Sequence, residues 1–177
     1  MFFIPGFVIS AATFPGVMVH EFAHQLFCRF FRVSIFHVCY FQFGNPAGYV
    51  LHEKASKPLH QILIGLGPFF VNTILGAVIA LPGIIGVIKF GGEQPLDYVL
   101  LWLGVSIAMH SFPSTQDASG IWDAIKDENL SWPLKIIFTP FVGLIFVGAI
   151  GAFFWLDLIY GIGVANLLSE IIGQMFV

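Results

Sequence analysis

Long apolar segments with very few charged residues between them dominate this chain, and they restrict the folds that it can adopt. Hydrophobic residues make up 58% of the 177 residues, charged residues only 10%, and the mean hydropathy is +0.91. Soluble domains carry about 25% charged residues, so a chain this poor in charge cannot cover its surface in water. Several segments also approach the roughly 20 residues that cross a bilayer as a helix. We therefore expect a multi-pass integral membrane protein.

The apolar segments predict about five transmembrane helices. The segments expected to cross are 2–31, 58–81, 96–112 and one or two spans within 133–177. Pro15-Gly16 is expected to kink the first helix, and 157–163 is the expected break in the last region. The short stretch 84–90 cannot cross again and is expected to be an interfacial or re-entrant piece.

Residues 33–52 have a different composition. β-branched and aromatic residues there flank the turn sequence 44–48, Gly-Asn-Pro-Ala-Gly. Two such runs around a turn predict a β-hairpin. The polar stretch 114–132 is expected outside the hydrocarbon. The predicted fold class is thus an all-α integral membrane protein with a small β-hairpin after the first helix.

The cations orient this layout. If the spans alternate, six cations fall on one side of the membrane and only Lys89 falls on the other. The six are Arg29, Arg32, Lys54, Lys57, Lys126 and Lys135. By the positive-inside rule the six-cation face is cytoplasmic, which makes the N-terminus external in a cell membrane. The absence of a basic tail argues against a nucleic-acid partner.

The motif that carries chemistry is His20-Glu21-x-x-His24, inside the first apolar segment. Positions i and i+4 share a helical face, so both imidazoles can reach one Zn²⁺. Glu21 is placed to accept a proton from a water that the metal activates. An ionisable group at mid-bilayer costs about 2.5–3.5 kcal/mol. This cost favours a metal site over the alternative, a polar cluster that only joins helices by hydrogen bonds.

A catalytic zinc also needs a third protein ligand and an open position for water. The extended HExxHxxGxxH motif is absent, because Phe27 and Phe30 stand where it requires Gly and His. Glu53, the nearest downstream glutamate, lies beyond the expected hairpin. The remaining candidate is Asp117, which follows the third apolar segment at its cytoplasmic end.

Two questions about these ligands stay open. Asp117 also suits the cap of a helix beginning near Ala118, and one carboxylate is not expected to serve both purposes. His110 is a rival third ligand, with an oxyanion, supporting or packing role as the alternative. The histidines near the cytoplasmic boundary are expected to be solvated or structural: His37, His52 and His60.

Taken together, residues 1–125 resemble the site-2 protease family of intramembrane zinc metalloproteases. The similarity lies in the HExxH motif, the β-rich segment after it, Gly67-Pro68 with Asn72 on the next helix, and an Asp after a proline-containing break. The alternative for Gly67-Pro68 is a purely structural role, as a kink that lets the membrane helix pack. The resemblance implies one Zn²⁺ on His20, His24 and Asp117, Glu21 as general base, and Asn72 with His110 toward the substrate or oxyanion.

The predicted function is that of an intramembrane zinc endopeptidase acting on membrane-spanning or membrane-proximal proteins and peptides. The chain is expected to form one membrane-embedded domain over 1–177, with its core in 1–125 and additional helices in 133–177. The hairpin either pairs with an unwound substrate strand or plugs the cytoplasmic mouth. The alternative functions are a metal-binding membrane transporter, which usually shows an internal repeat, and an inactive relative that binds membrane helices.

Overall fold

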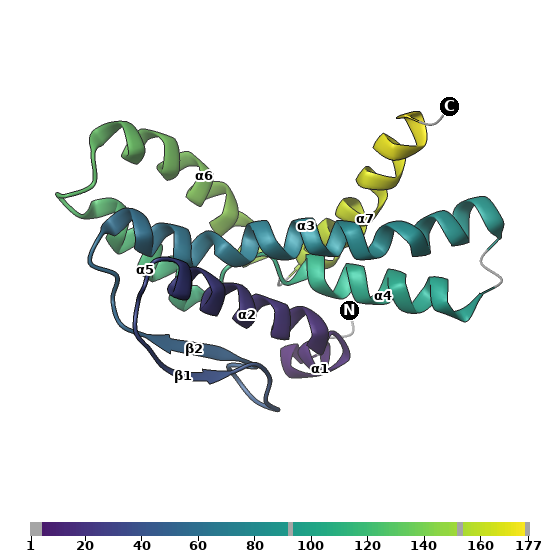
Figure 1. Cartoon of the computed structure of the whole chain (residues 1–177), viewed down its shortest axis with the longest axis horizontal. Helices are drawn as coiled ribbons and strands as arrows, with labels where there is room; N and C mark the ends of the chain where they lie inside the picture. Colours follow the sequence, from purple (N-terminus) through teal and green to yellow (C-terminus); the bar gives the residue numbers. More distant parts are fainter. Residues whose placement is uncertain (1–4, 92–93, 152–153, 176–177) are drawn as a thin grey trace.

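The structure is a computed structural model that describes residues 5–91, 94–151 and 154–175. These residues form a helical protein with one small antiparallel sheet (Figure 1). In chain order the elements are α1 (Gly6–Ala12), α2 (Phe14–Phe30), β1 (Ile35–Cys39), β2 (Tyr49–His52), α3 (Pro58–Phe90), α4 (Pro95–Met109), α5 (Thr115–Lys126), α6 (Trp132–Gly151) and α7 (Leu156–Met175). The predicted combination of helices with a hairpin after the first apolar segment is confirmed.

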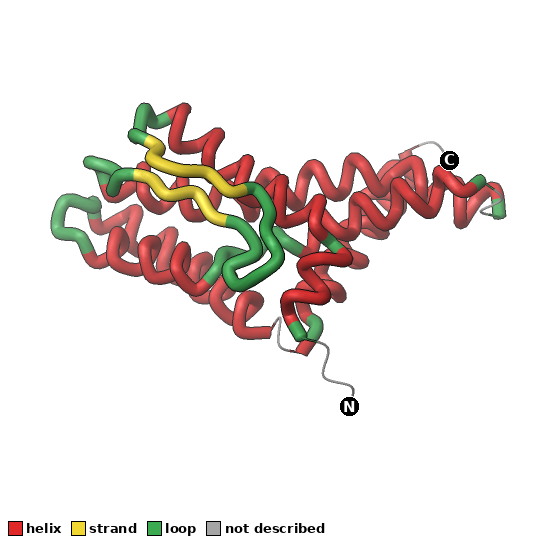
Figure 2. The backbone as a smooth tube through the Cα atoms, turned by 90° about the horizontal axis from the view of Figure 1, so that it is seen from below, coloured by secondary structure: helices red, strands yellow, loops and turns green. Residues whose placement is uncertain are grey.

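Helix α3 is the axis on which the other helices pack. Its 33 residues extend about 50 Å at 1.5 Å per residue, and α2, α4, α5 and α7 all contact it (Figures 1 and 2). The predicted end at residue 81, with a separate piece over 84–90, was wrong, because the helix continues through Pro82. Tertiary packing accounts for the difference: an added Cβ at Gly83 would lie 2.8 Å from the Leu101 nitrogen, so α4 holds this part of α3 closely.

Small residues set the contact between α3 and α4. A Cβ added at Gly76 would lie 2.7 Å from the Ala108 nitrogen, and one added at Gly104 would lie 2.6 Å from the Gly76 oxygen. On α3, Gly76 and Ala80 lie one helical turn apart, and on α4 Gly104 and Ala108 do the same. These two pairs of small residues face each other. Such pairs let helix backbones approach closely, which is the packing favoured between membrane helices.

The first apolar segment bends at Thr13 rather than at Pro15-Gly16. Helices α1 and α2 meet there at 87°. Pro15 stands in the first turn of α2, where its missing N–H costs nothing but prevents a helical bond back into α1. The Thr13 hydroxyl donates to the Ile9 carbonyl at 2.7 Å and satisfies the end of α1.

The hairpin has the register expected of two paired strands. Val38 lies opposite Val50 and Cys39 opposite Tyr49, with an irregularity between Ile35 and His37. Figure 2 shows both strands beside the helices at one end of the molecule. Both strands contact α2, the helix that carries the HExxH motif.

The C-terminal region contains two helices, and they diverge (Figure 1). The expected break at 157–163 was wrong, because α7 is continuous from Leu156. The direction changes just before it, where Trp155 adopts a φ of 63°. A 2.7 Å hydrogen bond between the hydroxyls of Tyr160 and Thr73 fastens α7 to α3.

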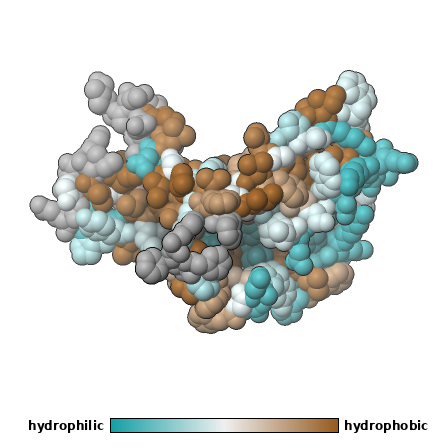
Figure 3. All heavy atoms as spheres, turned by 180° about the vertical axis from the view of Figure 1, so that it is seen from behind, coloured by the Kyte–Doolittle hydropathy of each residue, from teal (hydrophilic) through white to brown (hydrophobic). Residues whose placement is uncertain are grey.

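Hydropathy is distributed unevenly over the surface. Hydrophilic residues gather at one end, and hydrophobic residues cover much of the rest of the face drawn in Figure 3. Within the described ranges, α3 is the single helix long and apolar enough to cross a bilayer, over Pro58–Val87. The bent pair α1 and α2 adds a second if it forms one span, and shorter apolar helices cover Pro95–Met109, Trp132–Gly148 and Leu156–Leu167.

Candidate metal centre

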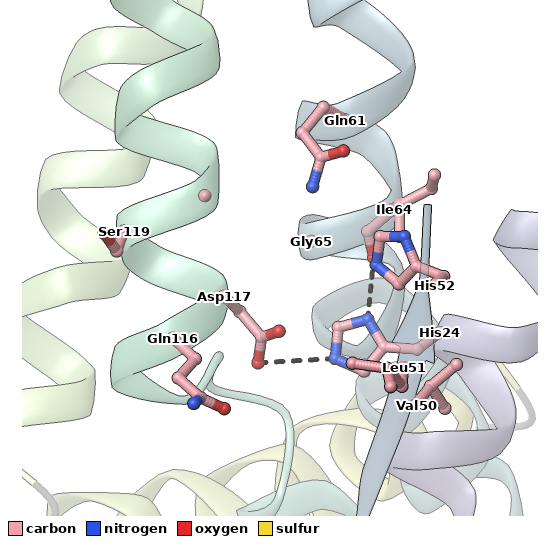
Figure 4. A pocket seen from close by; sticks show the side chains of 11 residues that line it. His24, Val50, Leu51, His52, Gln61, Ile64, Gly65, Gln116, Asp117 and Ser119 are labelled. Carbon is pink, nitrogen blue, oxygen red and sulfur yellow. Dashed lines mark hydrogen bonds and ion pairs between the residues drawn. The ribbon is translucent and has the colours of Figure 1, made fainter. Parts of the chain in front are cut away.

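Three side chains from two helices bring one ligand atom each to a common point. The Nε2 atoms of His20 and His24 lie 3.2 Å apart. The Oδ2 atom of Asp117 lies 3.7 Å from the first nitrogen and 3.4 Å from the second. In the part of the chain that the structure describes, no other three His, Cys, Asp or Glu side chains converge in this way. Figure 4 shows His24 and Asp117 facing each other across the gap between α2 and α5.

Helix α2 supplies the two imidazoles from one buried face. His20 and His24 are 8% and 5% exposed, and their rings meet edge to face with centroids 4.9 Å apart. The spacing of one helical turn places them on the same side. Burial follows because this side of α2 packs on α3 and α4.

The second ring nitrogen of His24 is held by α3. His24 Nδ1 lies 3.0 Å from the Ile64 carbonyl oxygen, as Figure 4 shows. In a regular helix the N–H of residue 68 would donate to that carbonyl. Pro68 has no N–H, so the Ile64 carbonyl is free to accept from the histidine. The position of Pro68, one turn beyond Ile64, therefore explains why the Ile64 carbonyl is available to His24.

The second ring nitrogen of His20 is held by the end of α4. His20 Nδ1 lies 2.7 Å from the carbonyl oxygen of His110, which is the C-cap residue of that helix. Carbonyls at a helix end lack an intrahelical donor. Asn72 reaches the same carbonyl with its Nδ2 at 3.2 Å. Both histidines thus rely on a main-chain carbonyl that the helices leave free.

These contacts place a hydrogen on Nδ1 of each ring. A carbonyl oxygen only accepts, so Nδ1 of each histidine carries the hydrogen and Nε2 of the neutral ring presents a lone pair. Two lone pairs and a carboxylate oxygen then face one another, and these three atoms repel each other unless a cation lies among them. Either a shared proton, giving an imidazolium–carboxylate ion pair, or a metal ion supplies that positive charge.

The donor set fits zinc. Zn²⁺ bound at about 2.0–2.1 Å by tetrahedral ligands places those ligands about 3.3 Å apart. The three separations of 3.2, 3.4 and 3.7 Å lie close to that value. Two imidazoles and one carboxylate also form a usual ligand set of catalytic zinc, which keeps a fourth position open.

Asp117 serves as a helix-capping residue at the same time. It is the N3 residue of α5, and its Oδ2 accepts from the Ser114 nitrogen at 2.9 Å and from the Ser114 hydroxyl at 2.6 Å. The capping role is thus observed, as the N3 partner of Ser114, and the role as a metal ligand stays a prediction. The cap lies on the same oxygen that faces the histidines, and it holds the carboxylate in that orientation, as partners of metal ligands do.

Electrostatics favours the ionised form of this carboxyl. Burial acts to raise the pKa of Asp117, but in the imidazolium–carboxylate form attraction to His24 and hydrogen bonds from His20 and His24 outweigh it. The pKa is therefore held well below its ordinary value. A bound cation would act in the same direction.

Glu21 lies beside the three ligand atoms. A small cavity of about 60 Å³ is lined by Glu21, His24 and Asp117 together with residues of β2. Gly48 lies directly against the Glu21 side chain, since an added Cβ there would be 3.0 Å from Glu21 Oε1. The volume admits a water molecule between the carboxylate and the ligand atoms.

Asn72 and His110 both have partners within the protein, and the substrate or oxyanion role that the resemblance implies stays a prediction. Asn72 is fully buried and its Nδ2 faces the carbonyls of Gly16, Ile107 and His110 at 3.1–3.2 Å. The His110 ring turns toward Thr13, with Nε2 2.8 Å from that hydroxyl. Neither side chain lines the cavities described here. Both residues act on the site through main-chain carbonyls.

Several cavity residues were not singled out from the sequence. A larger cavity of about 420 Å³ reaches His24 and Asp117 between β2, α3 and α5, and His52, Gln61 and Gln116 line it. His52 had been expected to be solvated or structural. Only the fold brings these residues together, although Pro68 offered a signal for the free Ile64 carbonyl.

Comparisons of the chain with protein-family models, with curated proteins and with solved structures gave no match. The interpretation of the site therefore rests on its own geometry.

We predict that Asp117→Asn lowers zinc affinity by more than about a hundredfold, because it removes the charged ligand and keeps the shape. Ser114→Ala is the matched variant: it removes the cap hydroxyl, destabilises α5 by about 1 kcal/mol and lowers zinc affinity by no more than about tenfold. Competition with a chromophoric chelator measures both. Wild-type zinc affinity in Asp117→Asn would contradict the ligand role.

Pro68→Ala restores an N–H that competes with His24 for the Ile64 carbonyl. We expect zinc affinity to fall about tenfold, the usual effect of losing a partner of a ligating histidine. Pro82→Ala adds an N–H to the same helix away from the site and should leave the affinity unchanged. Equal affinities for the two variants would show that the carbonyl released by Pro68 is not what holds His24.

Proposed function

We propose that this protein is a zinc endopeptidase of the membrane, with His20, His24 and Asp117 as zinc ligands. The observation that carries the proposal is that three acceptor atoms converge while the Nδ1 atoms of both histidines are held by main-chain carbonyls. The HExxH pattern adds the base expected of a peptidase, since Glu21 lines the same small cavity as His24 and Asp117. The site-2 protease family is the class that these features resemble.

The roles of the residues follow from their contacts. Zinc, when bound, lowers the pKa of its water ligand to about 7 and polarises a carbonyl. Glu21 would accept the proton of the attacking water and pass it to the leaving amine. Ile64 and His110 hold the histidine rings through their carbonyls, and Ser114 holds the carboxylate of Asp117. The larger cavity and β2 would receive the substrate.

Membrane embedding is the second part of the proposal. Large apolar side chains are widely exposed on α6 and α7, where Leu144 is 72% and Ile159 61% exposed. Soluble monomers rarely expose such continuous apolar surface, and lipid would cover it. The six cations stand at or beside the end of α2, the start of α3 and the α5–α6 connection, which gather at one end (Figure 1). That end would face the cytoplasm; Lys89, expected opposite, has a side chain outside the described residues.

Five helices would enter the bilayer in this arrangement: α2, α3, α4, α6 and α7. The 15 residues of α4 extend about 22 Å, less than the roughly 30 Å of hydrocarbon. A short span of this kind is accommodated by local thinning of the bilayer. A transporter with the same ligands is less well supported, because hydrophilic residues gather at one end of the molecule (Figure 3).

Glu21→Gln tests the enzymatic part directly. We expect the variant to keep its zinc and to lose about a hundredfold or more of its cleavage rate, since general-base catalysis contributes that much. The substrate is a panel of membrane-spanning peptides in detergent micelles, analysed by mass spectrometry. Glu53→Gln, the same change at an exposed position, should cleave like wild type. Equal cleavage by wild type and Glu21→Gln would exclude Glu21 as the base.

The membrane part predicts a topology. In a background with both cysteines replaced by alanine, Gln94→Cys should react with an impermeant maleimide in intact cells. Glu128→Cys, in the α5–α6 connection, should react only after the cells are opened. The protein should also resist extraction at alkaline pH. Release into the soluble fraction, or equal labelling at the two positions, would contradict this arrangement.

A further inference from the structure

The 420 Å³ cavity beside the candidate centre has one polar side chain on its α3 side, that of Gln61. Its volume lies within the range of ligand pockets, about 300–1,000 Å³. His24 and Asp117 form one end of it, so whatever enters reaches the candidate metal ligands. Figure 4 shows the Gln61 side chain on α3 pointing into this space, across from α5.

The Gln61 amide has a fixed orientation. Its Oε1 accepts a hydrogen bond from the main-chain nitrogen of Ala55 at 3.0 Å. This contact identifies the oxygen and leaves Nε2 as a donor on the cavity side. Gly120, on the opposite helix, faces this nitrogen: an added Cβ would lie 3.5 Å from it. A Cβ there would be in ordinary van der Waals contact with the amide, and the glycine leaves that volume unfilled.

The charge around the cavity is low. The residues that line it, among those the structure describes, include no lysine or arginine, and its one carboxylate belongs to Asp117. Gln116, His52 and Ser119 supply further neutral polar groups. Apart from Asp117 the lining is uncharged, so a fixed N–H donor there suits a neutral side chain with a carbonyl oxygen.

The position of the amide relates it to the cleaved bond. Gln61 precedes Ile64, the partner of His24, by three residues on α3, which corresponds to about 4.5 Å along the axis. One residue of an extended peptide spans about 3.3 Å. A peptide with its carbonyl at the candidate centre would thus place the side chain of an adjacent residue near Gln61.

We propose that Gln61 selects substrates with asparagine or glutamine at a residue next to the cleaved bond. The inference rests on the proposed peptidase function and adds a substrate class to it. The side chain enters between α3 and α5, and its carbonyl accepts from Gln61 Nε2. A leucine there would leave that donor unpaired.

Gln61→Glu tests the selection by inverting it. The new side chain keeps an oxygen for the Ala55 nitrogen and replaces the donor with a carboxylate. Wild type should prefer Gln or Asn over Leu or Lys by about threefold to tenfold in kcat/KM, the usual worth of one neutral hydrogen bond. Gln61→Glu should prefer Lys. Gln94→Glu, an exposed glutamine at the far end of α3 and α4, is the control and should keep the wild-type preference.

Two readouts separate the possible failures. Cleavage of a positional library in micelles gives the preference of the active protein, and binding of the same peptides to the zinc-loaded Glu21→Gln variant gives it without turnover. Gln61→Met, similar in length but without a donor, should lose the preference for Gln and Asn. Cleavage with unchanged preferences in Gln61→Glu and Gln61→Met overturns the inference alone. Zinc binding without any peptide cleavage or binding overturns the proposed function and the inference with it.

Discussion

The hydrogen bonds from two histidine Nδ1 atoms to main-chain carbonyls determine what this site can be. They turn the Nε2 atoms of His20 and His24 toward each other at 3.2 Å and toward the Asp117 carboxylate. Three acceptors in a buried place need a positive charge among them. The tertiary structure supplies the carbonyls from two other helices, and hence the site forms only when α2, α3 and α4 pack together.

Interruptions in the helical hydrogen bonding free the two carbonyls that hold the histidines. Pro68 leaves the Ile64 carbonyl without its helical donor, and the end of α4 leaves the His110 carbonyl free. Close contacts at Gly76 and Gly104 hold α3 and α4 in register, and the fully buried Asn72 ties both to α2. The capping box at Ser114 orients Asp117 from α5. The residues that look like local irregularities in the sequence are thus those that position the three converging side chains.

The sequence predicts most of the helices, the hairpin and the two histidines because their patterns are local, whereas Asp117 follows only as the remaining candidate for a third ligand. His20 and His24 are one turn apart, and the turn at 44–48 is flanked by β-forming residues. It does not predict that α3 runs through Pro82, since that depends on close packing against α4. It also does not predict the contacts of Asn72, whose amide faces three carbonyls contributed by α2 and by the end of α4. Gln61 and His52 escape notice for the same reason: nothing local places them beside the ligands.

X-ray absorption at the zinc edge of the purified, zinc-loaded protein tests the central claim most directly. The account predicts two imidazole nitrogens at about 2.0–2.1 Å and at least one carboxylate oxygen at about 2.0–2.2 Å. The imidazole signal should fall by half in His24→Ala. A spectrum without imidazole ligands, or one unchanged in His24→Ala, would contradict the proposal that these three side chains hold the metal.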